Sequence, residues 1–275
     1  MRRVRLHGPR GVESGVVDGA LIVTESGDEV EPLDLVTLEL PEPYTLLTPV
    51  EPPEVWCAGV TYERSRDARI GESAVQDVYS LVYAADRPEL FLKDAACRRT
   101  VGPGAAIGIR WDADWSVPEP EIALVLGEGG AIAGLTIGND VSSRDIEGAN
   151  PLYLPQAKVY AGACALGPAV YVADNVDAPL TIQMRILGAD GEELFAGETS
   201  TARMRRAFRD LVDYLLRDNP VPPGSVLLTG TGIVPPDELT LEAGQRVEIH
   251  VPEIGTLANP VALASDLLER VPLHV

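Results

Sequence analysis

Two glutamates separated by one residue, Glu119 and Glu121, are the residues of this sequence best placed to do chemistry. On a β-strand, side chains two positions apart point to the same face, so the two carboxylates can meet at one point. A glycine-rich turn at residues 127–130 and a second apolar run, Ile132–Ile137, then lead to Asp140. Two strands joined by that turn would bring Asp140 back beside the glutamate pair.

Three converging carboxylates repel one another unless a cation lies between them. Because Glu119, Glu121 and Asp140 offer oxygen atoms only, this set predicts a site for Mg²⁺, with Mn²⁺ or Ca²⁺ as alternatives, and argues against zinc. The other interpretation is that both glutamates are solvated charges on an edge strand, which the neighbouring Pro118 and Pro120 would permit. The residues by themselves leave the two interpretations open.

A lysine follows the three carboxylates along the chain. Lysine is scarce here, since Lys93 and Lys158 are the two in the sequence and arginine supplies the ordinary positive charge. A lysine beside a divalent cation has its ammonium form disfavoured by like charge, which lowers its pKa and allows it to act as a base. Lys158, in a polar segment interrupted by prolines, is therefore a candidate base; the alternative is an ordinary surface lysine.

A glycine-rich turn at Thr229–Gly232 follows an apolar strand pattern. Such a turn offers backbone N–H groups and hydroxyls to an anionic ligand. It lacks the lysine-containing pattern of a phosphate-binding loop, and a plain turn is the alternative interpretation.

Charge and cysteine content restrict the class of protein. The 275 residues include 22 Lys and Arg against 42 Asp and Glu, a net charge of −20, which argues against a nucleic-acid partner because phosphate binding needs a basic face. The 3 cysteines are widely spaced and form no metal-binding pattern, which predicts reduced thiols and a cytoplasmic location. No apolar segment is long enough for a signal peptide or a membrane span, so we expect no membrane partner.

The order of the expected elements predicts an α+β fold. Residues 1–53 hold short apolar runs and end in a proline-rich stretch, so we expect a small N-terminal β-rich domain there and a larger catalytic domain over residues 54–275. Short strands dominate the larger part, with one helix between Ser65 and Ala85 and another over Thr201–Arg217. This pattern favours a mixed β-roll over a regular alternation of strands and helices.

Four motifs, in this order and spacing, resemble the fumarylacetoacetate hydrolase family. They are Glu-x-Glu at residues 119–121, Gly-Asn-Asp-Val-Ser-Ser-Arg-Asp at residues 138–145, Gln-Ala-Lys at residues 156–158 and Thr-Gly-Thr-Gly at residues 229–232. The resemblance implies a β-roll catalytic domain of this family's type, in which Glu119, Glu121 and Asp140 bind Mg²⁺ or another divalent ion. It also places Lys158 and Thr231 at the positions of the family's lysine and threonine.

One motif departs from the family pattern. Many hydrolases and decarboxylases of the family carry a His and then a Glu on a lid helix, but Ser65 stands about where the His would be. The amino-acid sequence of residues 63–69 and 143–158 resembles instead that of a branch whose members dehydrate 2-keto-3-deoxy sugar acids. That resemblance implies that Ser65 and Arg66 contact the carboxylate end of a 2-keto acid substrate, with Arg66 using paired donors.

The resulting hypothesis is a metal-dependent dehydratase. It would convert 2-keto-3-deoxy-D-arabinonate, or the xylonate equivalent, to 2,5-dioxopentanoate. Lys158 would remove the C3 proton and Glu89 would protonate the departing C4 hydroxyl, although a surface position for Glu89 is an equal alternative. We expect a homodimer or a homotetramer.

Two other functions stay open at the level of the sequence. One is a hydrolase or decarboxylase of an acylpyruvate or a related diketo acid, which a histidine near the metal would favour. The other is a non-catalytic metal-binding scaffold, against which a lysine pointing into an open metal face would count.

Overall fold

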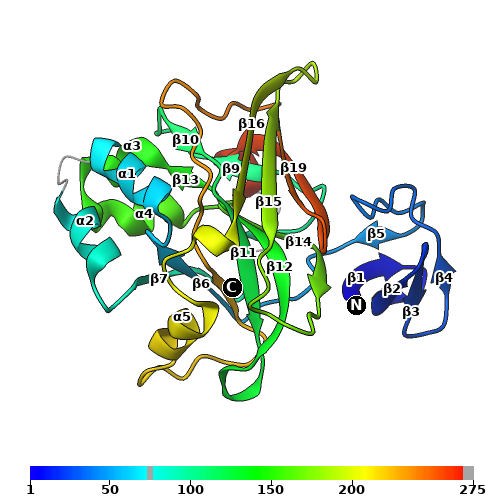
Figure 1. Cartoon of the computed structure of the whole chain (residues 1–275). Coiled ribbons are helices and arrows are strands. Elements are labelled where there is room, and N and C mark those ends of the chain that lie inside the picture. Colours follow the sequence, from blue (N-terminus) through cyan, green and yellow to red (C-terminus); the bar gives the residue numbers. More distant parts are fainter. Residues whose placement is uncertain (73–76, 269–275) are drawn as a thin grey trace.

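The computed structural model describes residues 1–72 and 77–268 of the chain. Two β-sheets form its main part, with short helices on one side and a small β-rich module on the other (Figure 1). This arrangement is the predicted α+β fold.

The larger sheet runs through both the N-terminal module and the main part. Its strands are, in spatial order, β4 (Glu29–Val30), β3 (Leu21–Thr24), β2 (Gly11–Asp18), β1 (Arg2–Gly8), β14 (Cys164–Tyr171), β12 (Ile132–Asp140), β11 (Pro120–Leu126), β17 (Val226–Leu228), β6 (Glu54–Gly59) and β7 (Glu89–Ala95). β5 (Thr45–Leu46) pairs with β1, and β8 (Thr100–Val101) pairs with β14.

The second sheet packs against the larger one. Its order is β16 (Glu193–Ser200), β15 (Thr181–Leu187), β18 (Arg246–Val251), β19 (Gly255–Leu263) and β9 (Ile107–Ile109), and β10 (Ser116–Val117) forms a separate pair with β13 (Ser142–Ser143). The helices are α1 (Glu63–Glu72), α2 (Asp77–Ala84), α3 (Arg144–Ala149), α4 (Leu154–Lys158), α5 (Phe208–Leu215) and α6 (Ala264–Leu267). Among the described residues, no helix combines the length and apolar character that crossing a membrane requires.

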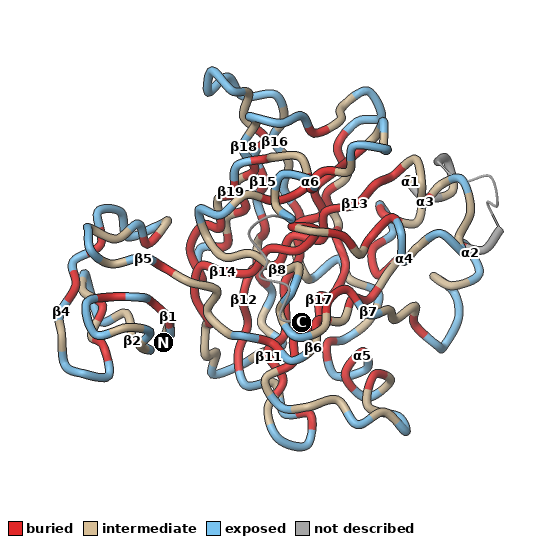
Figure 2. Tube along the Cα trace, turned by 180° about the vertical axis from the view of Figure 1, so that it is seen from behind, coloured by how far each residue is buried: buried red, intermediate tan, exposed pale blue. Residues whose placement is uncertain are grey.

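Strand β11 lies at the centre of the core and is buried along its whole length. Its alternate residues enter two apolar clusters: Ile122 and Leu124 pack with residues of the second sheet such as Met184, while Ala123 and Val125 pack on the other face. Burial on both faces explains why this strand is almost entirely apolar after Glu121. The buried chain is concentrated in this region (Figure 2).

The N-terminal module has its own small core, which includes Leu6, Ile22 and Leu38. It joins the rest of the larger sheet where β1 pairs with β14, through Arg2 opposite Tyr171 and Arg3 opposite Val170. The division into domains at residues 53 and 54 remains a prediction.

One predicted helix is shorter than expected. The helix proposed over Thr201–Arg217 is confirmed only as α5, because residues 201–203 form a 3₁₀ turn and Met204 forms a β-bridge with Tyr62. Backbone pairing with Thr61 and Tyr62 replaces the helical hydrogen bonds here. The Arg205 N–H, for example, donates to the Thr61 carbonyl at 2.9 Å. The other predicted helix corresponds to α1 and α2, and residues 73–76 of it lie outside the described residues.

Candidate active site

Glu119, Glu121 and Asp140 converge as their spacing predicted. One carboxylate oxygen from each residue lies within 4.8 Å of the others, and all three residues are buried. The hairpin of β11 and β12 sets this geometry: Pro120 is paired with Asn139, and the Asp140 N–H donates to the Glu119 carbonyl at 3.0 Å. The interpretation of Glu119 and Glu121 as solvated edge-strand charges is wrong, because β11 lies between β12 and β17.

The ammonium group of Lys158 lies among these carboxylates. Its Nζ donates to Glu119 Oε2 at 2.5 Å, to Asp140 Oδ2 at 2.9 Å and to Ser142 Oγ at 2.6 Å. Lys158 is the last residue of α4 and is only 2% exposed, so it is not a surface lysine. The short helix thus directs a long polar side chain inward, onto the ends of β11 and β12.

Two further buried cations contact the remaining oxygens of Glu119 and Asp140. Arg144 Nη2 donates to Glu119 Oε1 at 2.6 Å, and the Lys93 ammonium forms an ion pair with Asp140 Oδ1. Neither residue has a role predicted from the sequence. Lys93 carried a signal, because it is one of two lysines in the chain, and Arg144 stands inside the second family motif.

Glu121 differs from its two neighbours in the charges around it. Among the described residues, the ion pairs of the site involve Glu119 and Asp140 but not Glu121, whose Oε2 accepts the Gly230 N–H at 2.5 Å. Burial, then the negative charges of Asp140 and Glu119, raise the pKa of Glu121 well above its ordinary value. A group of oxygen donors with one buried carboxylate of raised pKa fits a hard divalent cation such as Mg²⁺.

Gly230 is held in a conformation that only glycine adopts readily. Its φ is +93°, and a Cβ on it would lie 2.0 Å from the Thr61 hydroxyl oxygen. The Thr61 hydroxyl in turn donates to the Thr229 carbonyl at 2.6 Å. This close packing brings the Gly230 N–H to the Glu121 carboxylate and explains the glycine in the turn.

The predicted substrate-binding residues Ser65 and Thr231 and the predicted acid Glu89 line one cavity with the three carboxylates and Lys158. Glu89 is the first residue of β7 and lies opposite Gly59 of β6. A Cβ on Gly59 would lie 2.0 Å from Glu89 Oε2, so the glycine provides the space that the Glu89 carboxylate fills.

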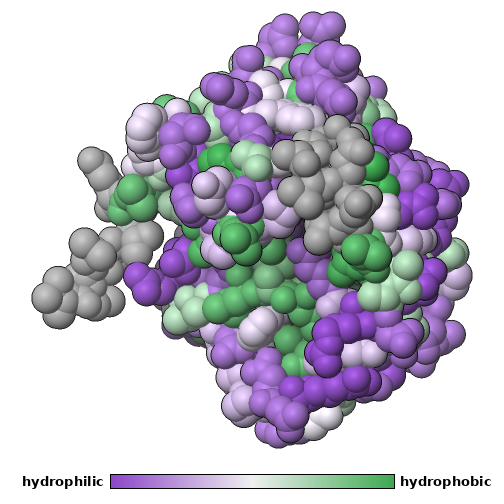
Figure 3. Space-filling model, turned by 90° about the vertical axis from the view of Figure 1, so that its left-hand side faces the viewer, coloured by the Kyte–Doolittle hydropathy of each residue, from purple (hydrophilic) through white to green (hydrophobic). Residues whose placement is uncertain are grey.

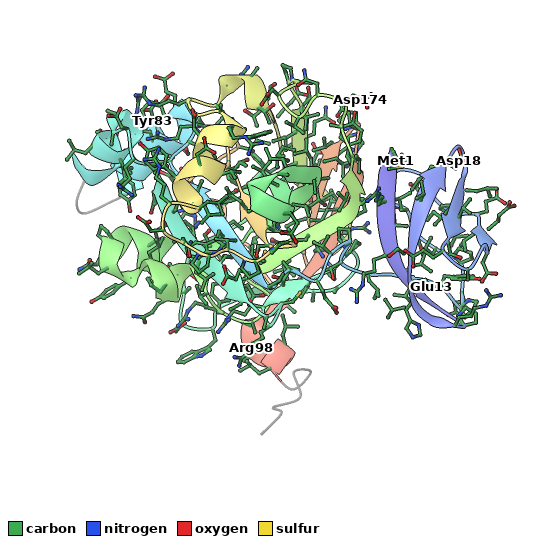
Figure 4. All side chains as sticks on the ribbon, turned by 90° about the horizontal axis from the view of Figure 1, so that it is seen from below. Met1, Glu13, Asp18, Tyr83, Arg98 and Asp174 are labelled. Carbon is green, nitrogen blue, oxygen red and sulfur yellow. The ribbon has the colours of Figure 1, made fainter. Side chains whose placement is uncertain are left out.

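Arg66 is not among the residues that line this cavity. Its guanidinium group pairs with Asp67 at 2.6 Å and with Glu63 at 3.1 Å, and it stacks 4.8 Å from the centre of the Tyr83 ring. Tyr83 lies on α2, at the end of the molecule opposite the N-terminal module (Figure 4). The proposed contact between Arg66 and a substrate carboxylate stays a prediction.

Glu147, which has no role predicted from the sequence, also lines the cavity and is buried. It lies on α3, with its Oε2 3.9 Å from Arg144 Nε. None of the described residues that line the cavity is a histidine. His7 lies on β1 and His250 on β18, where it bonds to Thr256, and His274 lies outside the described residues.

The family model for the fumarylacetoacetate (FAA) hydrolase C-terminal region matches residues 54–262. The chain belongs to this family. The predicted family and its fold type are therefore confirmed.

Two named relatives within the fumarylacetoacetate hydrolase family align with most of the chain. A Haloferax volcanii protein named "probable 2-keto-3-deoxyxylonate dehydratase" is 50% identical over 214 residues, which are 78% of this chain and 73% of that protein. A Saccharolobus solfataricus protein named 2-dehydro-3-deoxy-D-arabinonate dehydratase is 44% identical over 218 residues, again 78% of this chain and 73% of that protein.

The fold is shared with a solved structure of 2-keto-3-deoxy-D-arabinonate dehydratase complexed with magnesium and 2,5-dioxopentanoate. That structure matches with a TM-score of 0.84 at 36% identity, covering 96% of this chain and 99% of that chain. A 5-carboxymethyl-2-hydroxymuconate delta-isomerase from Mycobacterium smegmatis matches with a TM-score of 0.73 at 26% identity, covering 96% and 99%.

The raised pKa of Glu121 predicts how pH and metal together affect stability. In the metal-free protein the folded state holds the Glu121 proton to higher pH than the unfolded state does, so the free energy of unfolding falls as pH rises above the ordinary glutamate value of about 4.3. A bound divalent cation offsets this loss. The gain in melting temperature from Mg²⁺ over EDTA should therefore be larger at about pH 8 than at about pH 5.

The control is Glu121→Gln, which has no proton to lose at this position. Its melting temperature in EDTA should depend less on pH than that of the unaltered protein. An equal pH dependence in the two proteins would show that Glu121 is not the group responsible.

Proposed function

We propose that this protein is a divalent-metal-dependent hydro-lyase that removes water from a 2-keto-3-deoxy sugar acid. The substrate is 2-keto-3-deoxy-D-arabinonate or its xylonate equivalent, and the product is 2,5-dioxopentanoate. The observation that carries the proposal is the lysine ammonium of Lys158 in contact with Glu119 and Asp140, in a cavity whose described lining contains no histidine. The names of the two relatives, both dehydratases, support the same reaction.

Glu119, Glu121 and Asp140 are the residues that would hold Mg²⁺, and Mn²⁺ or Ca²⁺ have the same ligand preference. A divalent cation bound there supplies Lewis-acid chemistry, which polarises the oxygens of a 2-keto acid and makes its C3 protons more acidic. The magnesium in the related dehydratase structure supports this assignment.

Lys158 is the proposed base for the C3 proton. Its Nζ donates to Glu119 Oε2 and Asp140 Oδ2, which places it beside any molecule that approaches the three carboxylates. A divalent cation bound beside Lys158 would oppose the effect of the two carboxylates and favour the neutral form of the amine, which can accept a proton. Lys158 also lines the cavity together with Ser65, Glu89 and Thr231, and a cavity lined by these side chains argues against a non-catalytic metal-binding scaffold.

Glu89 is the proposed acid for the C4 hydroxyl. Removal of the C3 proton by Lys158 and protonation of the C4 hydroxyl by Glu89 release water and leave a double bond between C3 and C4. A proton then shifts from C5 to C3, and the hydroxyl proton on C5 shifts to C4 as the enol becomes an aldehyde, which gives 2,5-dioxopentanoate. Ser65 and Thr231, which line the cavity, offer hydroxyl groups to the substrate.

We also propose a cytoplasmic location and a homodimer or homotetramer. Cys57, Cys97 and Cys164 are all free, which supports a reducing compartment. Hydrophobic side chains gather on the face that carries α1 to α4 (Figure 3), where Leu81 is 67% and Leu152 is 84% exposed. An apolar face of this kind supports self-association.

The reaction is tested by incubating the protein with Mg²⁺ and one of several 2-keto acids. With 2-keto-3-deoxy-D-arabinonate or the xylonate equivalent, mass spectrometry should detect a product lighter by one water. Acetylpyruvate, a diketo acid, should remain intact. Cleavage of acetylpyruvate without dehydration of either sugar acid would replace this proposal with a hydrolase.

Lys158→Ala tests the proposed base. Loss of a general base lowers turnover by about 10²- to 10⁴-fold, whereas binding of Mg²⁺ should persist because the three carboxylates remain. Turnover of the sugar acid and calorimetric titration with Mg²⁺ measure the two properties separately. Arg185→Gln, which removes a surface ion pair with Glu193, is the matched control and should retain turnover. Unchanged turnover in the Lys158→Ala variant would exclude Lys158 as the base.

Gly59→Ala tests the proposed acid, Glu89, without replacing the Glu89 residue itself. The new methyl group would occupy the position of Glu89 Oε2 and displace the carboxylate, so kcat should fall about as far as in Glu89→Gln, by about 10²-fold or more. Gly127→Ala is the control, because its nearest neighbour to an added Cβ is 3.5 Å away. Full activity in both Gly59→Ala and Glu89→Gln would assign the acid to another residue.

A further inference from the structure

Lys93 is a fully buried lysine that the proposed reaction does not use. Its side chain is 0% exposed, and its ammonium group forms an ion pair with Asp140 Oδ1 and donates to the Val141 carbonyl at 2.9 Å. The Tyr160 ring lies 5.9 Å from Nζ on a further side. Burial of an ammonium group is costly unless such partners compensate for lost water, so this side chain has one defined position.

Each of the three carboxylates has one oxygen in contact with a fixed polar group of the protein. The Lys93 ammonium forms an ion pair with Asp140 Oδ1, Arg144 donates to Glu119 Oε1, and the Gly230 N–H donates to Glu121 Oε2. These donors come from β7, α3 and the turn after β17, which are separate parts of the fold. The carboxylates are therefore oriented by the protein and do not depend on a bound cation for their arrangement.

Rigid orientation distinguishes between divalent cations of equal charge. Mg²⁺ requires near-ideal octahedral geometry with oxygen atoms at about 2.0–2.1 Å, whereas Ca²⁺ accepts flexible geometry at about 2.3–2.6 Å. A carboxylate that is free to rotate can adapt to the larger ion. A carboxylate with one oxygen already in contact with the protein is less free to rotate, so it retains the arrangement that Mg²⁺ needs.

We propose that Lys93 is a positioning residue that holds Asp140 in one orientation and thereby gives the site its preference for Mg²⁺ over Ca²⁺. The inference rests on the proposed metal site of Glu119, Glu121 and Asp140. It adds the residue that fixes the shape of that site. Lys93 is the most direct of the three donors to test, because Gly230 acts through its backbone and Arg144 also lies against Glu147.

The test is calorimetric titration of the full-length protein with Mg²⁺ alone and with Ca²⁺ alone. Lys93→Met replaces the ammonium with an unbranched apolar side chain of similar length. Loss of a group that orients a metal ligand lowers metal affinity by about 10- to 100-fold, and we expect this loss for Mg²⁺. The affinity for Ca²⁺ should fall about tenfold less than the affinity for Mg²⁺, so the ratio of the two affinities should drop by about tenfold.

The ratio separates positioning from charge. Removal of the Lys93 positive charge changes the attraction for Mg²⁺ and Ca²⁺ in the same direction, because both carry two charges. Circular dichroism detects general loosening of the fold. Arg99→Gln is the matched control: it removes a neighbouring ion pair with Asp94 and should leave the ratio of the Mg²⁺ and Ca²⁺ affinities unchanged. Lys93→Gln, which keeps a hydrogen-bond donor, should give an intermediate ratio and replaces Lys93→Met if that variant does not fold.

An unchanged ratio in the folded variant overturns the role of Lys93 and leaves the proposed function intact. An unaltered protein that binds Mg²⁺ no more tightly than Ca²⁺ also overturns it, without any variant. If the unaltered protein binds neither ion, the proposed metal-dependent function fails together with this inference.

Discussion

Mutual repulsion among Glu119, Glu121 and Asp140 is the constraint on which the arrangement of the site depends. Their oxygens lie within 4.8 Å in a buried region, where charges are weakly screened. Lys93 and Lys158 offset part of this repulsion from two sides of Asp140. A divalent cation would offset the rest, so the same electrostatic demand explains both the buried cations and the fit to Mg²⁺.

The β-sheets supply the rigidity that this arrangement needs. β11 is buried on both faces between β12 and β17, and the ligands lie at the end of its hairpin with β12. Lys158, Ser65 and Glu89 reach the same cavity from α4, α1 and β7. Helices and strand ends around the packed sheets therefore supply the remaining groups of the site.

The sequence predicted the hairpin and its carboxylates because alternation along a strand is a local property. Glu119 and Glu121 share a face through their spacing, and the glycine-rich turn returns the chain to Asp140. The predicted helix over Thr201–Arg217 is partly wrong because Met204 pairs with the distant Tyr62. Helical periodicity of apolar residues cannot reveal such a competing backbone contact.

The sequence by itself determined the family, the carboxylate set and the candidate base, since these depend on residue types at short spacings. Only the tertiary structure decided which charges surround the set. Lys93 contacts Asp140, which lies 47 residues further along the chain, and Arg144 contacts Glu119, which lies 25 residues back. It also placed the Arg66 guanidinium against the Tyr83 ring of α2. Such contacts are fixed by how distant strands and helices pack, which local spacing does not encode.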